Sequence, residues 1–161
     1  MRLVVDASVA AKWFNIEELS DKAAEVRDAH VRGDLDLVAP THIIYEVGNS
    51  IWRNRQLTDQ DASDAVISIL RLGIELLPPS VERVGRAMKI ARLRRTTFHD
   101  SVYLQIAEEL NAALLTADEH QATAGKGIVK VIAGFVPFMV KLPVKLLPHS
   151  PMVSLHHNTR V

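Results

Sequence analysis

The sequence contains no cysteine. Disulfide bonds, zinc–thiolate sites and thiol nucleophiles are therefore excluded, and the composition fits a reducing compartment. Long apolar runs are also missing: near the C-terminus the longest uncharged run, Val131–Val140, is far shorter than the roughly 20 residues that span a bilayer. Asp6 interrupts what would be the apolar stretch of a signal peptide. We therefore expect a cytoplasmic protein with no membrane segment.

The chain also lacks an excess of charge of either sign. Its 19 basic and 19 acidic residues give a formal net charge of +0. A nucleic-acid-binding protein of this kind needs its positive charge clustered on one surface. One segment has such a cluster: Arg83, Arg86, Lys89, Arg92, Arg94 and Arg95.

Strand-like and helix-like segments alternate along most of the chain. Five short apolar runs predict strands, at 3–5, 35–38, 74–77, 113–116 and 128–133. Between them lie helical patterns, with Thr41, Thr58 and Ser80 as expected N-caps. Alternation of this kind predicts a three-layer α/β/α sandwich with a central, mostly parallel sheet of about five strands.

The last part of the sequence differs in composition. Four of the seven prolines and three of the seven histidines lie between Pro137 and Val161. We expect one folded domain over residues 1–133 and an irregular, proline-rich extension over residues 134–161. That extension could pack on the domain or on a partner chain.

Four carboxylates occupy suggestive positions in the predicted elements. Asp6 and Asp118 directly follow strands, Asp100 lies at the start of a helix, and Glu46 lies in a helix. Ligands in open α/β sheets bind outside the carboxyl ends of the strands. Carboxylates gathered there would repel one another unless cations neutralised them, and oxygen ligands suit Mg²⁺ or Mn²⁺. Asp6, Asp100 and Asp118 could instead serve as helix caps or turn residues, and Glu46 could be a solvated helix residue.

Four motifs, in this order, resemble those of the PIN-domain ribonucleases, and within that family the VapC-type toxins. The motifs are Val4–Ser8 followed by Lys12–Phe14, Pro40–Asn49, His99–Ala107 and Leu115–Asp118. The likeness covers roughly residues 1–133, and each motif alone is weak, whereas their order is specific. His99 stands where the family usually has an aromatic residue.

The resemblance implies that Asp6, Glu46, Asp100 and Asp118 are catalytic and hold one or two Mg²⁺ or Mn²⁺ ions, with Ser8 and Thr116 as supporting groups. Asn49 lies one helical turn from Glu46 and is a further candidate for the site. The chain would be an endoribonuclease for single-stranded RNA and the toxin of a toxin–antitoxin pair. It would form a homodimer and bind a cognate antitoxin that inserts a basic side chain among the carboxylates.

The chemistry of the residues agrees with hydrolysis by metal-activated water. No cysteine is present and no convincing Ser-His-Asp set appears, so such a water is the nucleophile at hand. Arg92, Arg94 and Arg95 are candidates for contacts with substrate phosphates, although an arginine run is more often a solvated helix face. The aromatic residues Trp13, Phe14, Tyr45 and Trp52 are expected in the core or a dimer face rather than in a base-stacking platform.

Two other functions remain open. One is a non-catalytic RNA-binding or scaffolding module with the same fold. The other is a phosphohydrolase or receiver-like domain of related architecture. That class fits poorly, because the residues after the first strand, Asp6-Ala7-Ser8, lack a second aspartate and the second strand ends in Ala39-Pro40 without an acceptor.

Overall fold

A computed structural model describes residues 1–131 of the chain, with backbone only for residues 129–131. Its centre is a five-stranded sheet in the order β3-β2-β1-β4-β5, in which every neighbouring pair is parallel. The strands are β1 (Arg2–Val5), β2 (Asp36–Pro40), β3 (Glu75–Leu77), β4 (Ala113–Thr116) and β5 (Val129–Val131). The predicted parallel sheet of about five strands is therefore confirmed.

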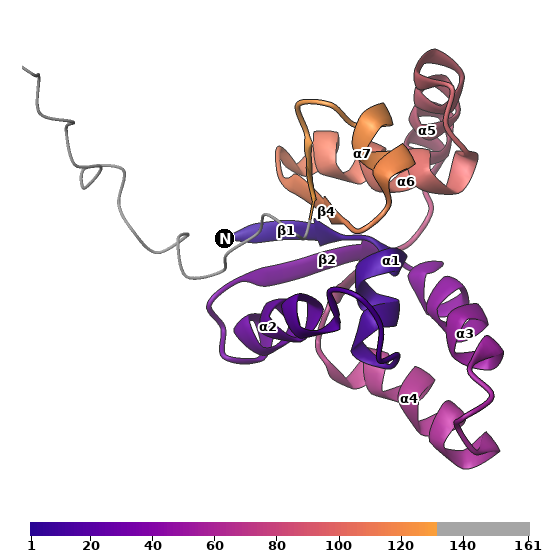
Figure 1. The fold of residues 1–161 in the computed structure, drawn as a ribbon. Helices are drawn as coiled ribbons and strands as arrows, with labels where there is room; N and C mark the ends of the chain where they lie inside the picture. The colour runs from indigo at the N-terminus through magenta and orange to yellow at the C-terminus, as the bar shows by residue number, and fades with distance from the viewer. Residues whose placement is uncertain (132–161) are drawn as a thin grey trace, which may run out of the picture.

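Helices cover both faces of the sheet (Figure 1). On one side lie α1 (Ala7–Ala10), a 3₁₀ turn (Ala11–Trp13), α2 (Ser20–Val31), α3 (Ile43–Arg53) and α4 (Asp59–Arg71). On the other side lie α5 (Val81–Arg94), α6 (Phe98–Leu110) and α7 (Glu119–Ala124). This arrangement is the expected α/β/α sandwich.

The strands are short, apolar runs because both faces of a parallel sheet are buried. Three consecutive residues of β1, Leu3, Val4 and Val5, are at most 1% exposed. Leu114 and Leu115 of β4 are fully buried beside them. This tightly packed centre holds the ends of β1 and β4 in fixed register, which matters for the side chains that follow each strand.

Helix starts agree with the sequence patterns at two positions and differ at a third. Thr58 forms a capping box with Asp61, and Ser80 caps α5 by accepting from the Arg83 N–H. Thr41 was expected to cap α3, but His42 stands at the N-cap with no side-chain cap bond. The backbone N–H of Thr41 instead donates to Leu77 O, at 3.1 Å, which ties this turn to β3.

Two of the aromatic side chains expected in the core or a dimer face lie on the surface. Tyr45 is 77% exposed and Trp52 is 67% exposed, and both belong to α3. That helix buries Ile43, Val47 and Ile51 instead. A position in the core is therefore wrong for these two rings, because helical periodicity alone does not separate core contacts from an apolar surface.

The sequence predicted a boundary at residue 133 between the folded domain and the C-terminal extension. The proposed extension, residues 134–161, and the last two residues of the predicted fifth strand lie outside the described residues. Within positions 1–131, no helix is both long and apolar enough to cross a membrane.

Candidate active site

Asp6 lies at the carboxyl end of the sheet because of the register between β1 and β4. Val5 is paired with Leu115, so the next residues of the two strands, Asp6 and Thr116, lie side by side. The Asp6 N–H donates to Leu115 O at 3.0 Å, and the Thr116 hydroxyl donates to Asp6 Oδ2 at 3.0 Å. The parallel pairing thus fixes the direction of this carboxylate.

Ser8 and Thr116 hold the same oxygen of Asp6. The Ser8 hydroxyl donates to Asp6 Oδ2 at 2.5 Å, and the Ser8 N–H donates to it at 3.2 Å. Ser8 Oγ in turn accepts from the Ala117 N–H at 2.9 Å. Asp6 is only 6% exposed, and its burial raises its pKa to about 6, despite the hydrogen bonds that oppose this shift. Asp6 is therefore a buried carboxylate with a fixed orientation, and the hydrogen bonds to it do not fully offset the cost of burying its negative charge.

Glu46 projects from the first turn of α3 toward α6. The buried Tyr103 hydroxyl donates to Glu46 Oε2 at 2.5 Å, and His42 Nε2 lies 3.5 Å from the same oxygen. Burial, and then the nearby His99, lower the pKa of His42 to about 4, so this imidazole is neutral near pH 7 and does not neutralise Glu46. Tyr103 is therefore the group that fixes Glu46 in place.

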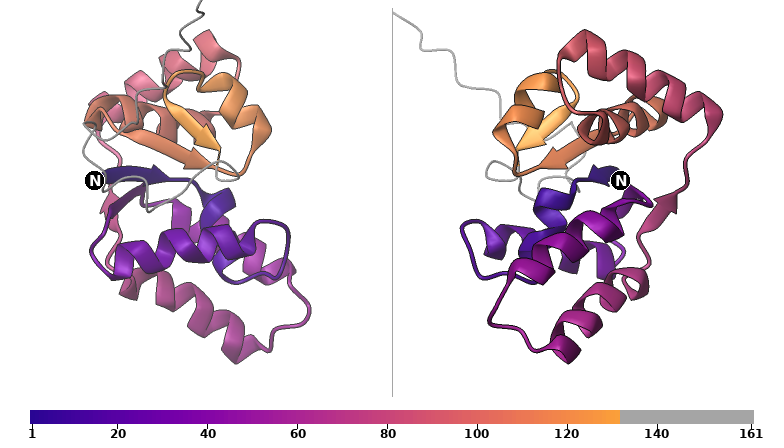
Figure 2. Two further views of the ribbon diagram at one scale, coloured as in Figure 1. Left: turned by 60° about the vertical axis from the view of Figure 1, so that its left-hand side comes forward. Right: turned by 90° about the vertical axis from the view of Figure 1, so that its right-hand side faces the viewer.

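Asp100 belongs to the first turn of α6, whose N-cap is Thr97. The hydroxyls of Thr97 and Thr96 donate to Asp100 Oδ2 at 2.6 and 3.2 Å. The Asp100 N–H donates to Thr97 Oγ1 at 3.1 Å, so Thr97 and Asp100 are joined by two reciprocal hydrogen bonds. Figure 2 shows α3 and α6 in opposite layers, on the two sides of the sheet, and Glu46 and Asp100 belong to these two helices.

Three of the carboxylates repel one another. Burial raises the pKa of Glu46, and the negative charge of Asp100 raises it further. Glu46 in turn contributes to the raised pKa of Asp6. Among the described residues, no lysine or arginine forms an ion pair with any of the three. This electrostatic arrangement favours a bound cation.

Asp118 has a different environment from the other three. It is exposed and caps α7, accepting from the N–H groups of His120 and Gln121 at 2.7 and 3.0 Å through Oδ1. Its own N–H donates to Thr116 Oγ1 at 3.0 Å. Asp118 is thus connected to Asp6 through Thr116. The helix that it caps, α7, was not anticipated from the sequence.

The arginines of the basic segment have unequal surroundings. Arg94 donates to Ala124 O at 2.7 Å and pairs with Glu108 at 3.2 Å, whereas Arg92 and Arg95 are exposed. Arg95 takes a left-handed conformation after α5, with φ 53°. It lines a hollow of about 630 Å³ together with Arg94, Thr97, Asp100 and His120. Positive charge therefore borders Asp100. Asn49, the other supporting candidate from the sequence, is exposed on α3.

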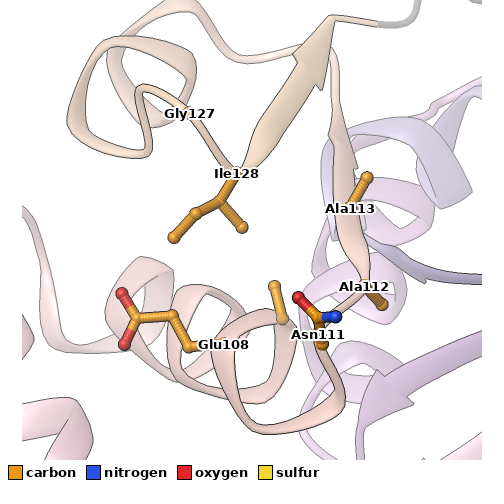
Figure 3. Close-up of a pocket in the computed structure, with 7 residues that line it drawn as sticks. Glu108, Asn111, Ala112, Ala113, Gly127 and Ile128 are labelled. Carbon is orange, nitrogen blue, oxygen red and sulfur yellow. The ribbon is translucent and has the colours of Figure 1, made fainter.

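A second hollow, of about 510 Å³, lies at the opposite edge of the sheet (Figure 3). Glu108 of α6 and Asn111, which directly follows that helix, border it, across from Gly127 and Ile128, which precede β5. Asn111 and Ala112 lie before β4 begins, at the amino ends of the strands. Because ligands in such sheets bind at the carboxyl ends, we place the active site at the edge that holds Asp6.

The oxygen-rich site fits a hard divalent cation in its donor chemistry. The carboxylates of Asp6, Glu46 and Asp100 form no ion pair with a lysine or arginine within the described part of the chain, and the nearby His99 only partly offsets the raised pKa of Glu46. In that part, no three His, Asp or Glu side chains are yet gathered closely enough to hold an ion. Binding would therefore require the carboxylates to turn toward a shared ion, which would also remove their mutual repulsion.

Comparison with known proteins identifies the family of this chain. The family model of the PIN domain matches residues 3–127. The chain is a PIN-domain protein. Ribonuclease VapC3 of Pyrobaculum aerophilum is 32% identical over 127 residues, which are 76% of this chain and 93% of VapC3. Exonuclease VapC9 of the same organism is 31% identical over 91 residues, 55% of this chain and 66% of VapC9. The chain thus belongs with the VapC nucleases of the PIN family, whose members generally use divalent metal ions.

Solved structures show the same fold. PAE2754 from Pyrobaculum aerophilum has a TM-score of 0.59 at 25% identity, with 83% of this chain and 85% of that one covered. Mycobacterium tuberculosis VapC20, a toxin that cleaves the sarcin–ricin loop, has a TM-score of 0.61 at 13% identity, covering 79% and 96%. The VapBC2 structure from Rickettsia felis, bound to promoter DNA, also scores 0.61, at 10% identity, covering 81% and 98%.

Two residues of this PIN domain were missed as site residues. Tyr103 and His42 both contact Glu46, although both lie within motifs that were singled out from the sequence. Tyr103 is three residues after Asp100 on the same helix, which places both on one side of α6. That spacing was the available signal for Tyr103.

Proposed function

We propose that this PIN domain is a metal-dependent endoribonuclease that hydrolyses single-stranded RNA, and that it is the toxin of a toxin–antitoxin pair. The observation that carries the proposal is the set Asp6, Glu46 and Asp100, three carboxylates that repel one another at the carboxyl edge of the sheet and form no ion pair with a lysine or arginine among the described residues. Relatives named as a ribonuclease and an exonuclease support a nuclease activity.

In this proposal the chain's own residues bind and orient. Asp6, Glu46 and Asp100 hold Mg²⁺ or Mn²⁺, as one or two ions, while Asp118 acts directly or through water. Ser8 and Thr116 fix Asp6, and Tyr103 fixes Glu46. The bound ion supplies Lewis acidity and lowers the pKa of water near the phosphate. Hydrolysis joins the water oxygen to phosphorus and breaks one phosphorus–oxygen ester bond, which leaves a phosphate monoester and a free hydroxyl.

Circular single-stranded RNA is the decisive substrate, because an exonuclease cannot begin on a molecule without ends. We expect the wild-type protein to linearise it with Mg²⁺ or Mn²⁺ and to leave it intact with EDTA. Asp6→Asn and Asp100→Asn should abolish cleavage. Asp64→Asn, at an exposed position of α4, is the matched control and should cleave as wild type. Cleavage of linear RNA alone would contradict the endonuclease assignment.

The scaffolding alternative makes an opposite prediction about metal. A PIN domain that only binds RNA should show no heat above buffer when titrated with Mn²⁺, whereas we expect saturable binding that Asp6→Asn abolishes. Saturable binding without any cleavage of RNA would leave the metal site intact and exclude the nuclease.

The uncompensated carboxylates also predict how an antitoxin would inhibit. A basic side chain inserted among them would make charge-assisted hydrogen bonds and exclude the cation. We expect a cognate antitoxin peptide to block cleavage and to compete with Mn²⁺ in titrations. We expect the toxin itself to sediment as a homodimer. Inhibition without competition for the metal would contradict this mode of binding.

A further inference from the structure

One side of α3 is open to solvent from its first turn to its last. Tyr45 is 77% exposed and Trp52 is 67% exposed, and Asn49 and Arg53 between and beside them are also exposed. These positions follow the spacing i, i+4, i+7 and i+8, which places them on one side of a helix. The opposite side packs inward through Ile43, Val47 and Ile51. We call the exposed residues Tyr45, Asn49, Trp52 and Arg53, with Arg55, the α3 face.

The basic side chains of this face are not committed to carboxylates. The Arg55 guanidinium lies over the Trp52 ring, 5.6 Å from its centroid. Within the described residues, neither Arg53 nor Arg55 forms an ion pair, whereas Arg83 and Arg94 are paired with Glu109 and Glu108. The α3 face therefore combines two exposed aromatic rings with positive charge that is available to an anionic ligand.

The face is continuous with the active site. Tyr45 directly precedes Glu46, and Asn49 lies one turn beyond Glu46 on the same helix. Seven residues of helix separate Tyr45 from Trp52, a distance of about 10 Å along the axis. That length corresponds to roughly three stacked nucleotides of a strand with a rise of about 3.4 Å.

We propose that the α3 face binds the single-stranded RNA that flanks the cleaved phosphate. Tyr45 stacks on a base next to that phosphate, Trp52 stacks on a base roughly three nucleotides away, and Arg53 and Arg55 contact the phosphates between them. Aromatic rings with interspersed arginines are the usual means of holding single strands without base-specific hydrogen bonds. This inference rests on the ribonuclease activity proposed above, because it places the strand by its position over Glu46.

A protein partner is the other ligand that tryptophan, tyrosine and arginine favour. RNA is the better occupant for two reasons. The unpaired charge of the face is positive, which complements a phosphate backbone. A substrate must also pass beside Glu46 to reach the site, whereas a protein partner has no such need. The test therefore compares these two occupants directly.

The chain offers a specific optical probe, since it has two tryptophans. Trp13 is 8% exposed and donates its indole N–H to Ala23 O at 2.9 Å, so only Trp52 is placed to meet a ligand. The experiment titrates oligouridine of about 12 nucleotides into the full-length Asp100→Asn protein, which does not cleave it. We expect saturable quenching of tryptophan fluorescence, with the Trp13 emission left unchanged.

Variants of the α3 face should distinguish the loss of a stacking ring from a general disturbance of the folded structure. Trp52→Phe keeps a stacking ring, so it should bind RNA within about twofold of the parent, measured by a labelled oligonucleotide, while the quenching disappears. Trp52→Ala and Tyr45→Ala should each weaken binding by about tenfold or more. Leu93→Ala, at a residue of α5 that is 83% exposed, is the control and should bind as the parent does.

The outcomes distinguish this inference from the activity on which it rests. If the wild-type protein cleaves circular RNA but Trp52→Ala and Tyr45→Ala bind and cleave normally, the α3 face is not an RNA site. If those variants instead change the sedimentation coefficient and leave RNA binding unaltered, the face is a protein interface. If RNA binds the Asp100→Asn parent and quenches its tryptophan fluorescence, but the wild type cleaves no RNA, the α3 face is an RNA site and the nuclease assignment fails.

Discussion

The hydroxyl of Tyr103 donates to Glu46 Oε2 at 2.5 Å and so connects α6 to α3 across the active site. Burial and the charge of Glu46 raise the pKa of Tyr103 well above its usual value, which keeps the hydroxyl protonated as a donor. Glu46 is thereby held in one orientation in a site where like charges would otherwise push it away. The geometry of this carboxylate depends on a residue that is not itself acidic.

Replacing Tyr103 with phenylalanine should release Glu46. We expect Mn²⁺ affinity to fall by about 10- to 100-fold, as for other groups that orient metal ligands, and unfolding free energy to fall by about 1–3 kcal/mol. Isothermal titration and urea unfolding measure the two effects. Tyr45→Phe removes an exposed hydroxyl and is the matched control. Unchanged Mn²⁺ affinity in Tyr103→Phe would show that Glu46 is positioned by other contacts.

Asp6 should make the metal-free protein less stable at neutral pH than at acidic pH. Its pKa is raised from 3.8 to about 6, so the folded state holds this proton more tightly than the unfolded state. The resulting stabilisation is complete below about pH 4 and is lost as the pH rises through about 6, a change of about 3 kcal/mol. Urea unfolding with EDTA at several pH values should show this decline.

Asp6→Asn provides the internal comparison for that pH effect. The variant buries no charge, so with EDTA it should be more stable than wild type near pH 7 and no more stable near pH 4. Added Mn²⁺ should raise the melting temperature of the wild type and leave that of the variant unchanged. A wild type whose stability rises between about pH 4 and pH 6 relative to the variant would contradict the raised pKa.

Two variants at Asp118 separate its structural role from a catalytic one. Asparagine is as good an N-cap as aspartate, so Asp118→Asn should keep α7 while removing the charge, and Asp118→Ala should cost about 1 kcal/mol. If Asp118 acts through water, Asp118→Asn should weaken Mn²⁺ binding less than Asp6→Asn does. Mn²⁺ titration and thermal unfolding of both variants measure these differences.

The arginines near the site should differ in their effects on RNA. Arg95 is exposed beside Asp100, so Arg95→Ala should weaken binding of single-stranded RNA and reduce its salt dependence by about one phosphate contact. Arg83 forms two hydrogen bonds with Glu109, at 3.0 and 2.8 Å, and Arg83→Ala should leave RNA binding unchanged. If both variants lose RNA affinity equally across a salt series, the effect comes from the overall charge of the protein and not from a specific phosphate contact.

The register of the central strands explains why so much was predictable. Asp6 and Thr116 lie at the carboxyl ends of two apolar runs that were correctly predicted as strands, and the structure adds that these two strands are neighbours. The capping box of Thr58 was equally local and was confirmed. Features set by a strand end or by one helical turn need no information from the rest of the chain.

Contacts between helices in different layers could not be predicted from the sequence in the same way. The pairing of Tyr103 with Glu46 joins residues 57 positions apart, and it depends on how α3 and α6 are placed over the sheet. Trp52 was expected in the core or a dimer face because its apolar ring fits a helical stripe, yet that stripe does not say which side faces the sheet. The short helix α7 was not predicted, although a cap was one of the two interpretations given for Asp118, because its six residues are too few to show a helical period.

The position of β4 has a consequence for the synthesis of this protein. The hydroxyl that helps to orient Asp6 comes from Thr116, at the other end of the domain, and the strand that carries it forms its contacts with β1 only after the intervening helices exist. A nascent chain that has emerged only as far as α5 has Asp6 and Glu46 but neither Asp100 nor Thr116. The proposed metal site is therefore complete only after most of the domain has been translated.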